Sequence, residues 1–257
     1  MSTPARLADA IAIAEAARPV ALAHFRTHLG VEFKSDESPV TIADRGVEAE
    51  VRRMIADRFP DHGIFGEEHG IEGEDSDDLW IVDPIDGTRS FITGHPLFGF
   101  LLAKLHRGRA ELAVVSIPPT GEVFSAEAGQ GAFLNGSAIH ASGRTDAEGA
   151  AVYVNEGEKI WRAHPDVFAR LMAFGKTRRL SCDCYPYGLL AMGHVDVVVD
   201  YDLQPYDYHP VALLVAEAGG VITDWEGSPL GMGYGVPVVA AATPELHAKA
   251  LAVIRGQ

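Results

Sequence analysis

The segment Trp80 to Thr88, with the sequence WIVDPIDGT, places two carboxylates, a proline, a glycine and a hydroxyl directly after a short apolar run. Asp83 and Asp86 straddle a turn, so both side chains can point into one concavity. Mg²⁺ prefers oxygen ligands and would relieve the repulsion between them. A helix beginning near Gly87 and Thr88 would direct backbone N–H groups at the same place. The segment therefore predicts a metal site that coincides with a phosphate site.

A structural alternative exists for each of these residues. Asp83 could begin a turn, Asp86 could cap a helix, and Thr88 could simply occupy the first helical turn. For one residue alone this alternative is favoured. For the whole segment it is weak, because capping needs one acidic residue and leaves the other without a function.

Two other segments can contribute carboxylates to the same site. Glu67 and Glu68 lie in a glycine-flanked stretch, and a carboxylate from a second segment is what a site with two metal ions needs. Asp207 lies where an apolar helix begins. Alone, the adjacent glutamates would indicate a solvated face with His69 at the surface, and Asp207 would indicate a helix N-terminal charge. We favour the metal-ligand interpretation because the segments occur together.

The elements that must position these residues change in character along the chain. The first half begins with two amphipathic helices, one bent at Pro19, and continues with short strands joined by turns. The second half alternates strands with helices. We therefore predict an α+β half over residues 1–145 and an α/β half over 146–257. The expected helices cover 5–29, 44–59, 165–174, 187–192, 210–218 and a C-terminal segment from Thr243, and the expected strands cover 97–105, 110–117, 122–126, 131–134, 152–155, 178–182, 195–200, 221–223 and 236–241.

Together these segments resemble the inositol monophosphatase family of the fructose-1,6-bisphosphatase-like superfamily. Residues 66–68 are similar to its GEE element, and residues 83–88 repeat its DPIDGT motif without a change. Thr41 to Asp44 matches its T-x-x-D pattern, and Asp207 with the EAGG sequence at 217–220 resembles its C-terminal signature. The resemblance implies a layered αβαβα sandwich and a phosphatase that hydrolyses a small phosphate monoester.

The resemblance also implies a role for each site residue. Two or three Mg²⁺ ions would be held by Glu67, Asp83, the carbonyl of Ile85, Asp86 and Asp207. Glu67 and Thr88 would position and activate water, and Asp44 would support them through another water molecule. Phosphate and the rest of the substrate would be bound by Asp86, Gly87, Thr88, Asp183 and Asp200.

Departures from the inositol enzymes point to one branch of the family. Tyr206 stands where the family usually has tryptophan, and residues 89–94, 183–188 and 203–207 resemble the histidinol-phosphate phosphatase branch. Asp183 and Asp200 could pair with the cationic end of histidinol phosphate. Inositol 1-phosphate, or a broader range of sugar or nucleotide phosphates, remains the alternative substrate. Asp200 could equally be a strand-end turn residue.

Composition limits the partners of the protein. The 257 residues include 36 acidic and 21 basic ones, a net charge of −15, which disfavours binding to nucleic acid or to an anionic membrane. We expect a small phosphorylated metabolite as the partner. Cys182 and Cys184 are too close in sequence for a favourable disulfide, and together they suggest packing in a reducing compartment. The scattered histidines match no zinc motif.

The remaining expectations concern the location and assembly of the protein, and the alternative that it is not an enzyme. No apolar run reaches the 18 or so residues of a membrane span, so we expect a cytoplasmic protein. The family resemblance implies a homodimer. A binding or regulatory protein that had lost catalysis should lack a metal ligand or Thr88, and here all are present.

Overall fold

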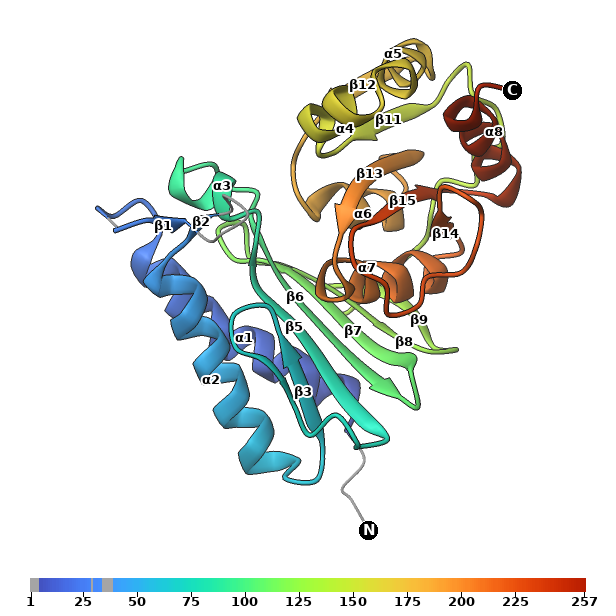
Figure 1. The fold of residues 1–257 in the computed structure, drawn as a ribbon. Coiled ribbons are helices and arrows are strands. Elements are labelled where there is room, and N and C mark those ends of the chain that lie inside the picture. Colours follow the sequence, from blue (N-terminus) through green and yellow to red (C-terminus); the bar gives the residue numbers. More distant parts are fainter. Residues whose placement is uncertain (1–4, 29, 34–38) are drawn as a thin grey trace.

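The computed structural model describes residues 5–28, 30–33 and 39–257. Helices and sheets alternate in five layers, helix, sheet, helix, sheet, helix, from one side of the molecule to the other (Figure 1). The layered αβαβα sandwich expected from the resemblance is therefore confirmed. No helix in the described part of the chain is long and apolar enough to cross a membrane.

The first layer consists of α1 (Leu7–His24) and α2 (Ile42–Arg58), which lie side by side against the larger sheet (Figure 1). Small residues on α1 allow the two helices to approach closely, and they are Ala10, Ala14, Ala17 and Ala21. The predicted helix over 5–29 is too long, because Phe25 takes an extended conformation and ends α1. Pro19 lies within α1. Residue 29 is outside the described residues.

The larger sheet has eight strands in the order β10-β9-β8-β7-β6-β5-β3-β4. Its neighbours are antiparallel except β3 and β5, which run parallel. The strands are β3 (Gly63–Gly66), β4 (Gly70–Glu72), β5 (Asp78–Asp86), β6 (Gly99–His106), β7 (Arg109–Ile117), β8 (Glu122–Glu127), β9 (Gly131–Leu134) and β10 (Ser137–Ile139). The sequence analysis did not predict β3, β4 or β10.

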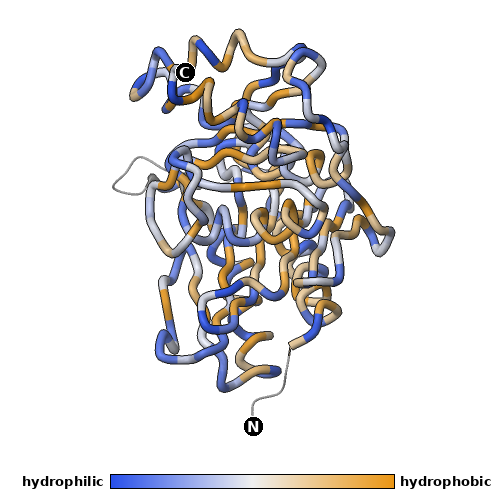
Figure 2. Tube along the Cα trace, turned by 90° about the vertical axis from the view of Figure 1, so that its right-hand side faces the viewer, coloured by the Kyte–Doolittle hydropathy of each residue, from blue (hydrophilic) through white to orange (hydrophobic). Residues whose placement is uncertain are grey.

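Both faces of the larger sheet are covered, which explains the apolar run from Phe100 to Ala103 in β6. Side chains alternate between the faces of a strand. Phe100 and Leu102 pack toward α1 and α2, whereas Leu101 packs into the core on the opposite face. Figure 2 shows hydrophobic stretches running through the interior of the molecule and hydrophilic stretches along its outer loops.

The middle layer contains α6 (Tyr185–Ala191) and α7 (Pro205–Glu217), between the two sheets (Figure 1). The smaller sheet has the order β12-β11-β13-β15-β14. Its strands are β11 (Ala151–Val154), β12 (Thr177–Leu180), β13 (Val197–Leu203), β14 (Val221–Asp224) and β15 (Val236–Ala241). The last layer is formed by α4 (Gly157–Ala163), α5 (Pro165–Ala173) and α8 (Pro244–Arg255). The sequence analysis missed α4.

Three short elements, two strands and a helix, also belong to the fold. The strands β1 (Glu32–Phe33) and β2 (Pro39–Val40) pair in antiparallel orientation, and the helix α3 (Thr88–Ile92) follows β5.

Glu217, at the end of α7, accepts hydrogen bonds from the backbone N–H groups of Gly129 and Gly131, both at 2.8 Å. The EAGG segment therefore joins the middle layer to the turn between β8 and β9. The division of the chain at residue 145 stays a prediction.

Two further predicted boundaries were wrong for identifiable reasons. The helix expected over 210–218 begins at Pro205, because proline suits the first position of a helix and Pro210 is accommodated inside it. The strand expected over 178–182 ends at Leu180. Ser181 and Cys182 have φ angles of 62° and 106°, which no strand residue adopts.

Candidate metal centre and substrate pocket

A pocket lies where the end of β5, the start of α7 and the ends of β11 and β13 meet. Most residues singled out in the sequence line it, namely Glu67, Asp83, Ile85, Asp86, Gly87, Thr88, Asp183, Asp200 and Asp207. Asp44 is not among the lining residues, but its carboxylate contacts the Thr88 hydroxyl. Segments far apart in the sequence are therefore brought to one cavity, as predicted.

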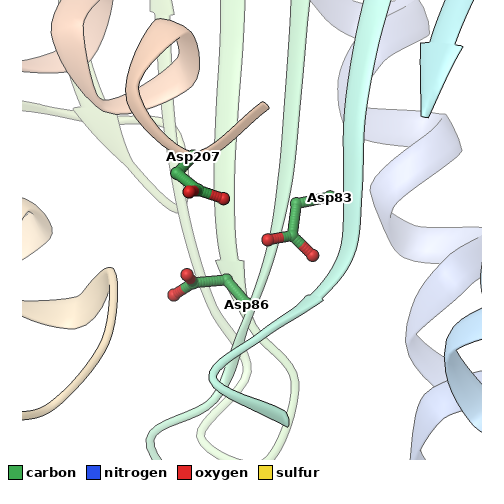
Figure 3. A group of neighbouring side chains, drawn as sticks. All are labelled: Asp83, Asp86 and Asp207. Carbon is green, nitrogen blue, oxygen red and sulfur yellow. The ribbon is translucent and has the colours of Figure 1, made fainter. Parts of the chain in front are cut away.

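Three carboxylates form the centre of the pocket. Oxygen atoms of Asp83, Asp86 and Asp207 all lie within 4.8 Å of one another. Asp83 and Asp86 come from the end of β5, Asp207 comes from the first turn of α7, and the three side chains point toward one another (Figure 3). Oxygen ligands at this spacing suit a hard divalent cation such as Mg²⁺.

Each of these carboxylates is oriented by a backbone N–H group. Asp83 accepts from Ile85 at 2.9 Å, and Asp207 accepts from Gln204 at 2.7 Å. A turn contact, the structural alternative for Asp83, and a charge in the first turn of a helix, the alternative for Asp207, therefore both occur together with the convergence of the two carboxylates. Asp86 does not cap α3, because Gly87 is the N-cap and Asp86 instead accepts from the Cys184 N–H at 2.6 Å.

The electrostatics of the cluster favour a bound cation. Burial, followed by repulsion from neighbouring carboxylates, raises the pKa of Asp83 and of Asp86 well above the ordinary range. Burial likewise raises the pKa of Asp207 to about 8. No arginine, lysine or histidine among the described residues forms an ion pair with the three. The donor set thus fits a divalent ion, which would supply the missing positive charge.

The residues expected to act on water surround this cluster. Glu67 lies in the turn between β3 and β4, lines the pocket, and is close enough for its charge to raise the pKa of Asp83. The Thr88 hydroxyl lies 3.2 Å from both Asp44 Oδ1 and the carbonyl of Ile85. Asp44 is fully buried and also accepts from the backbone and side chain of Thr41, at 2.8 and 2.6 Å. A single contact network therefore joins Asp44 to Thr88.

Asp200 lines the pocket, is buried, and is not a strand-end turn residue. It belongs to β13, beside an irregularity in the pairing with β15. Its carboxylate accepts from Asn155 at 3.0 Å, from Tyr187 at 3.1 Å and from the backbone of Tyr201 at 2.9 Å. Burial raises its pKa to about 7.

The Asp183 side chain lines the pocket and packs directly against Gly87 of the DPIDGT segment. A Cβ atom at Gly87 would lie 2.3 Å from the Asp183 carboxyl carbon, and the φ of Gly87 is 83°, so only glycine fits there. The Ser90 hydroxyl donates to Asp183 at 2.6 Å. Burial raises the Asp183 pKa to about 6.

Sequence reasoning missed several residues of the pocket. Asn155 and Tyr187 orient Asp200, and Glu156, Lys159 and Asp202 line the rim. Tyr187 belongs to a segment that the family resemblance had singled out, but the rim residues had no such signal. Glu156 and Asp202 have positive φ angles of 42° and 67°, which marks both as unusual backbone positions only once the structure is known.

Comparison with known sequences gives a consistent family assignment. The pattern of the inositol monophosphatase family matches residues 5–257. The chain is 36% identical over 249 residues to the bifunctional phosphatase IMPL2 of Arabidopsis thaliana chloroplasts, covering 93% of this chain and 72% of the relative. It is 40% identical over 222 residues to a histidinol-phosphatase of Chlorobaculum parvum, covering 85% of each. A Nus factor SuhB of Pseudomonas aeruginosa is 35% identical over 212 residues, covering 78% of this chain and 77% of the relative.

Solved structures agree with this assignment. An inositol monophosphatase from Zymomonas mobilis superposes with a TM-score of 0.86 at 33% identity and covers 97% of both chains. An IMPase/NADP phosphatase complexed with Mg²⁺ and phosphate has a TM-score of 0.85 at 21% identity over 96% of this chain and 94% of that one, a likeness that shows the fold alone. The resemblance found in the sequence is confirmed, and the chain belongs to the inositol monophosphatase family.

Proposed function

We propose that this protein is a Mg²⁺-dependent phosphatase that hydrolyses histidinol phosphate to histidinol and inorganic phosphate, a step of histidine biosynthesis. The phosphatase class follows from the family and from the carboxylate cluster. The choice of substrate depends on the charge of the outer pocket.

The outer pocket carries more negative than positive charge. Beyond the metal-binding carboxylates it is lined by four acidic residues, Glu156, Asp183, Asp200 and Asp202, and by two basic ones, Arg89 and Lys159. Lys159 pairs with Asp202 at 3.0 Å, and Arg89 lies 3.8 Å from Glu156. Among the described residues, Asp183 and Asp200 form no ion pair with arginine or lysine.

This surplus of carboxylates suits a substrate with a cationic end. Histidinol phosphate carries an ammonium group and an imidazole, and both can donate hydrogen bonds to carboxylates. A positive charge beside Asp200 would also keep it ionised, although burial raises its pKa to about 7. A neutral polyol would offer no such compensation. The 40% identical histidinol-phosphatase supports the same substrate.

The geometry of the pocket supports a role for each of these residues in the proposed reaction. We propose that Glu67, Asp83, the Ile85 carbonyl, Asp86 and Asp207 hold two or three Mg²⁺ ions. Bound Mg²⁺ would neutralise the phosphate dianion and lower the pKa of water. Thr88 and Glu67 would orient the attacking water, and Asp44 would fix the Thr88 hydroxyl through their 3.2 Å contact. Gly87 and Thr88 would bind the phosphate at the pocket floor. Attack of water at phosphorus would form a new P–O bond as the P–O ester bond breaks. One proton of that water would remain on the released phosphate, and the other would pass to the departing alkoxide, which leaves as the alcohol.

Location and assembly also remain proposals, and of the two only the assembly rests on the family. We propose a cytoplasmic location and a homodimer. A binding or regulatory protein without catalysis is the alternative from a different functional class, and several relatives carry the name Nus factor SuhB. The presence of every implied ligand and of Thr88 favours catalysis.

A substrate panel tests the proposed function. Phosphate release is measured from histidinol phosphate, inositol 1-phosphate, fructose 1,6-bisphosphate, adenosine bisphosphate and p-nitrophenyl phosphate, with Mg²⁺ and with a chelator. We expect Mg²⁺-dependent release and the highest kcat/KM for histidinol phosphate. A higher kcat/KM for inositol 1-phosphate would rule out histidinol phosphate as the preferred substrate. Absence of phosphate release from every ester would rule out the proposed enzymatic function.

A further inference from the structure

Helix α2 carries a second buried carboxylate one turn after Asp44. Glu48 has no exposed surface, and its spacing of four residues places it on the same face of the helix as Asp44. Neither the pocket lining nor the metal cluster includes it. A fully buried carboxylate requires compensation by hydrogen bonds or by a positive charge, so its partners indicate its function.

Those partners lie in the turn that carries Glu67. One oxygen of Glu48 accepts from the Glu68 backbone N–H at 2.7 Å. The other accepts from the His69 backbone N–H at 3.2 Å, lies 3.1 Å from His69 Nδ1, and accepts from Arg52 Nε at 2.8 Å. Both oxygens of this carboxylate are therefore engaged, and three of the four contacts reach the two residues that follow Glu67.

The same turn fits closely around the Glu48 carboxylate. A Cβ atom at Gly66 would lie 2.2 Å from a Glu48 oxygen, so no other residue fits at Gly66 without displacing this side chain. The glycine of the GEE element is thus explained by Glu48. Arg52, which pairs with Glu48, also donates to the carbonyl of Gly70 at 2.5 Å. The pair holds the turn at both ends.

Glu67 lies between these fixed points. Its own backbone N–H donates to the carbonyl of Val82 at 3.2 Å, one residue before Asp83. The turn is thus fastened to α2 on one side and to β5 on the other. Small changes in the 66–70 backbone would move the Glu67 side chain relative to Asp83, and sites of this kind tolerate little displacement.

We propose that Glu48 is a positioning residue that fixes the 66–70 turn so that Glu67 is held at the metal site, and that the Mg²⁺ affinity of the protein depends on it. The inference rests on the proposed function of the site. In this proposal, two carboxylates one turn apart on α2 orient residues of the metal site without binding the metal themselves. Asp44 contacts the Thr88 hydroxyl, and Glu48 binds the backbone beside Glu67.

The test is Mg²⁺ binding to the metal-free protein, measured by titration calorimetry. Glu48→Gln keeps the size of the side chain but presents an NH₂ group to at least one N–H donor. We expect its dissociation constant for Mg²⁺ to rise about 10-fold to 100-fold, the usual effect of losing a group that orients metal ligands. Glu50→Gln is the matched control, because Glu50 pairs with Arg53 on the outer side of the same helix. It should bind Mg²⁺ as the parent does.

A merely structural role predicts different results. Glu48→Gln would then lower the melting temperature of the metal-free protein while its folded fraction bound Mg²⁺ normally, and this would overturn the proposal. A positioning role also predicts that kcat/KM falls at low Mg²⁺ and recovers at saturating Mg²⁺. A loss that Mg²⁺ does not restore, with unchanged affinity, would count against it.

A second variant covers the case in which Glu48→Gln does not fold. His69→Ala removes one partner of Glu48 from a side chain that is 45% exposed, so the fold should tolerate it. We expect a smaller but measurable loss of Mg²⁺ affinity. An unchanged affinity in His69→Ala, together with an unfolded Glu48→Gln, would assign Glu48 to folding alone. Failure of the proposed function looks different, because the parent protein itself would then bind no Mg²⁺.

Discussion

Binding of Mg²⁺ to the metal-free protein should release protons, because the carboxylates of the centre hold protons when no cation is present. Burial raises the pKa of Asp207 to about 8, and the pKa values of Asp83 and Asp86 are raised as well. At pH 7, a group with a pKa of about 8 is roughly nine-tenths protonated. Since a metal ligand must be deprotonated, Asp207 alone should release about 0.9 of a proton for each ion that it binds.

Calorimetry in two buffers with different ionisation enthalpies measures this number directly. The observed enthalpy should differ between the buffers, with a slope that gives the protons released. The apparent Mg²⁺ affinity should rise about tenfold between pH 6 and pH 7, since both values lie below the Asp207 pKa and at least one proton is exchanged. Asp207→Asn should reduce the slope. Equal enthalpies in both buffers, with the same affinity at both pH values, would refute the reasoning.

Three further outcomes follow from the same structure. The folded-state pKa of Asp207 lies above its ordinary value of 3.8, so its contribution to stability is complete below pH 3.8 and is lost as the pH rises through about 8. The melting temperature of the metal-free protein should therefore fall from pH 5 to pH 8. A melting temperature that does not change over this range would contradict the burial of this group. Asp83→Asn should lower kcat/KM for phosphate release about 100-fold or more, since it removes a ligand rather than a group that orients one; parental turnover would exclude Asp83 from the site. Asp200→Asn should reduce kcat/KM for an amine-bearing ester about tenfold more than for p-nitrophenyl phosphate, because a charge-assisted hydrogen bond to the substrate is lost. Equal losses for the two esters would show that Asp200 does not recognise the amine.

The five-layer fold could be expected from the sequence, but mainly through the family resemblance. Hydrophobic periodicity located the principal helices and many of the strands. It could not locate β3 and β4, since these are short strands of three or four residues in a glycine-rich segment. It also placed the start of α7 five residues late, because Pro210 was interpreted as a helix start although Pro205 occupies that position.

Asp83 and Asp86 could be singled out from the sequence because two carboxylates beside a proline and a glycine are unusual in so short a segment. Asp83 and Asp86 could be assigned from one segment, and the structure places Asp207 beside them as expected. Long-range partners were not predictable in the same way. Glu48 carries no signal of its own, since a glutamate in an amphipathic helix normally faces solvent, and only its burial against the 66–70 turn distinguishes it.

The most direct test is a crystal structure of the protein with Mn²⁺ and inorganic phosphate, with the metal located by anomalous scattering. The account predicts an anomalous peak bounded by Asp83, Asp86 and Asp207, with phosphate beside Gly87 and Thr88. Manganese bound only elsewhere, with these three carboxylates still free of metal, would contradict it.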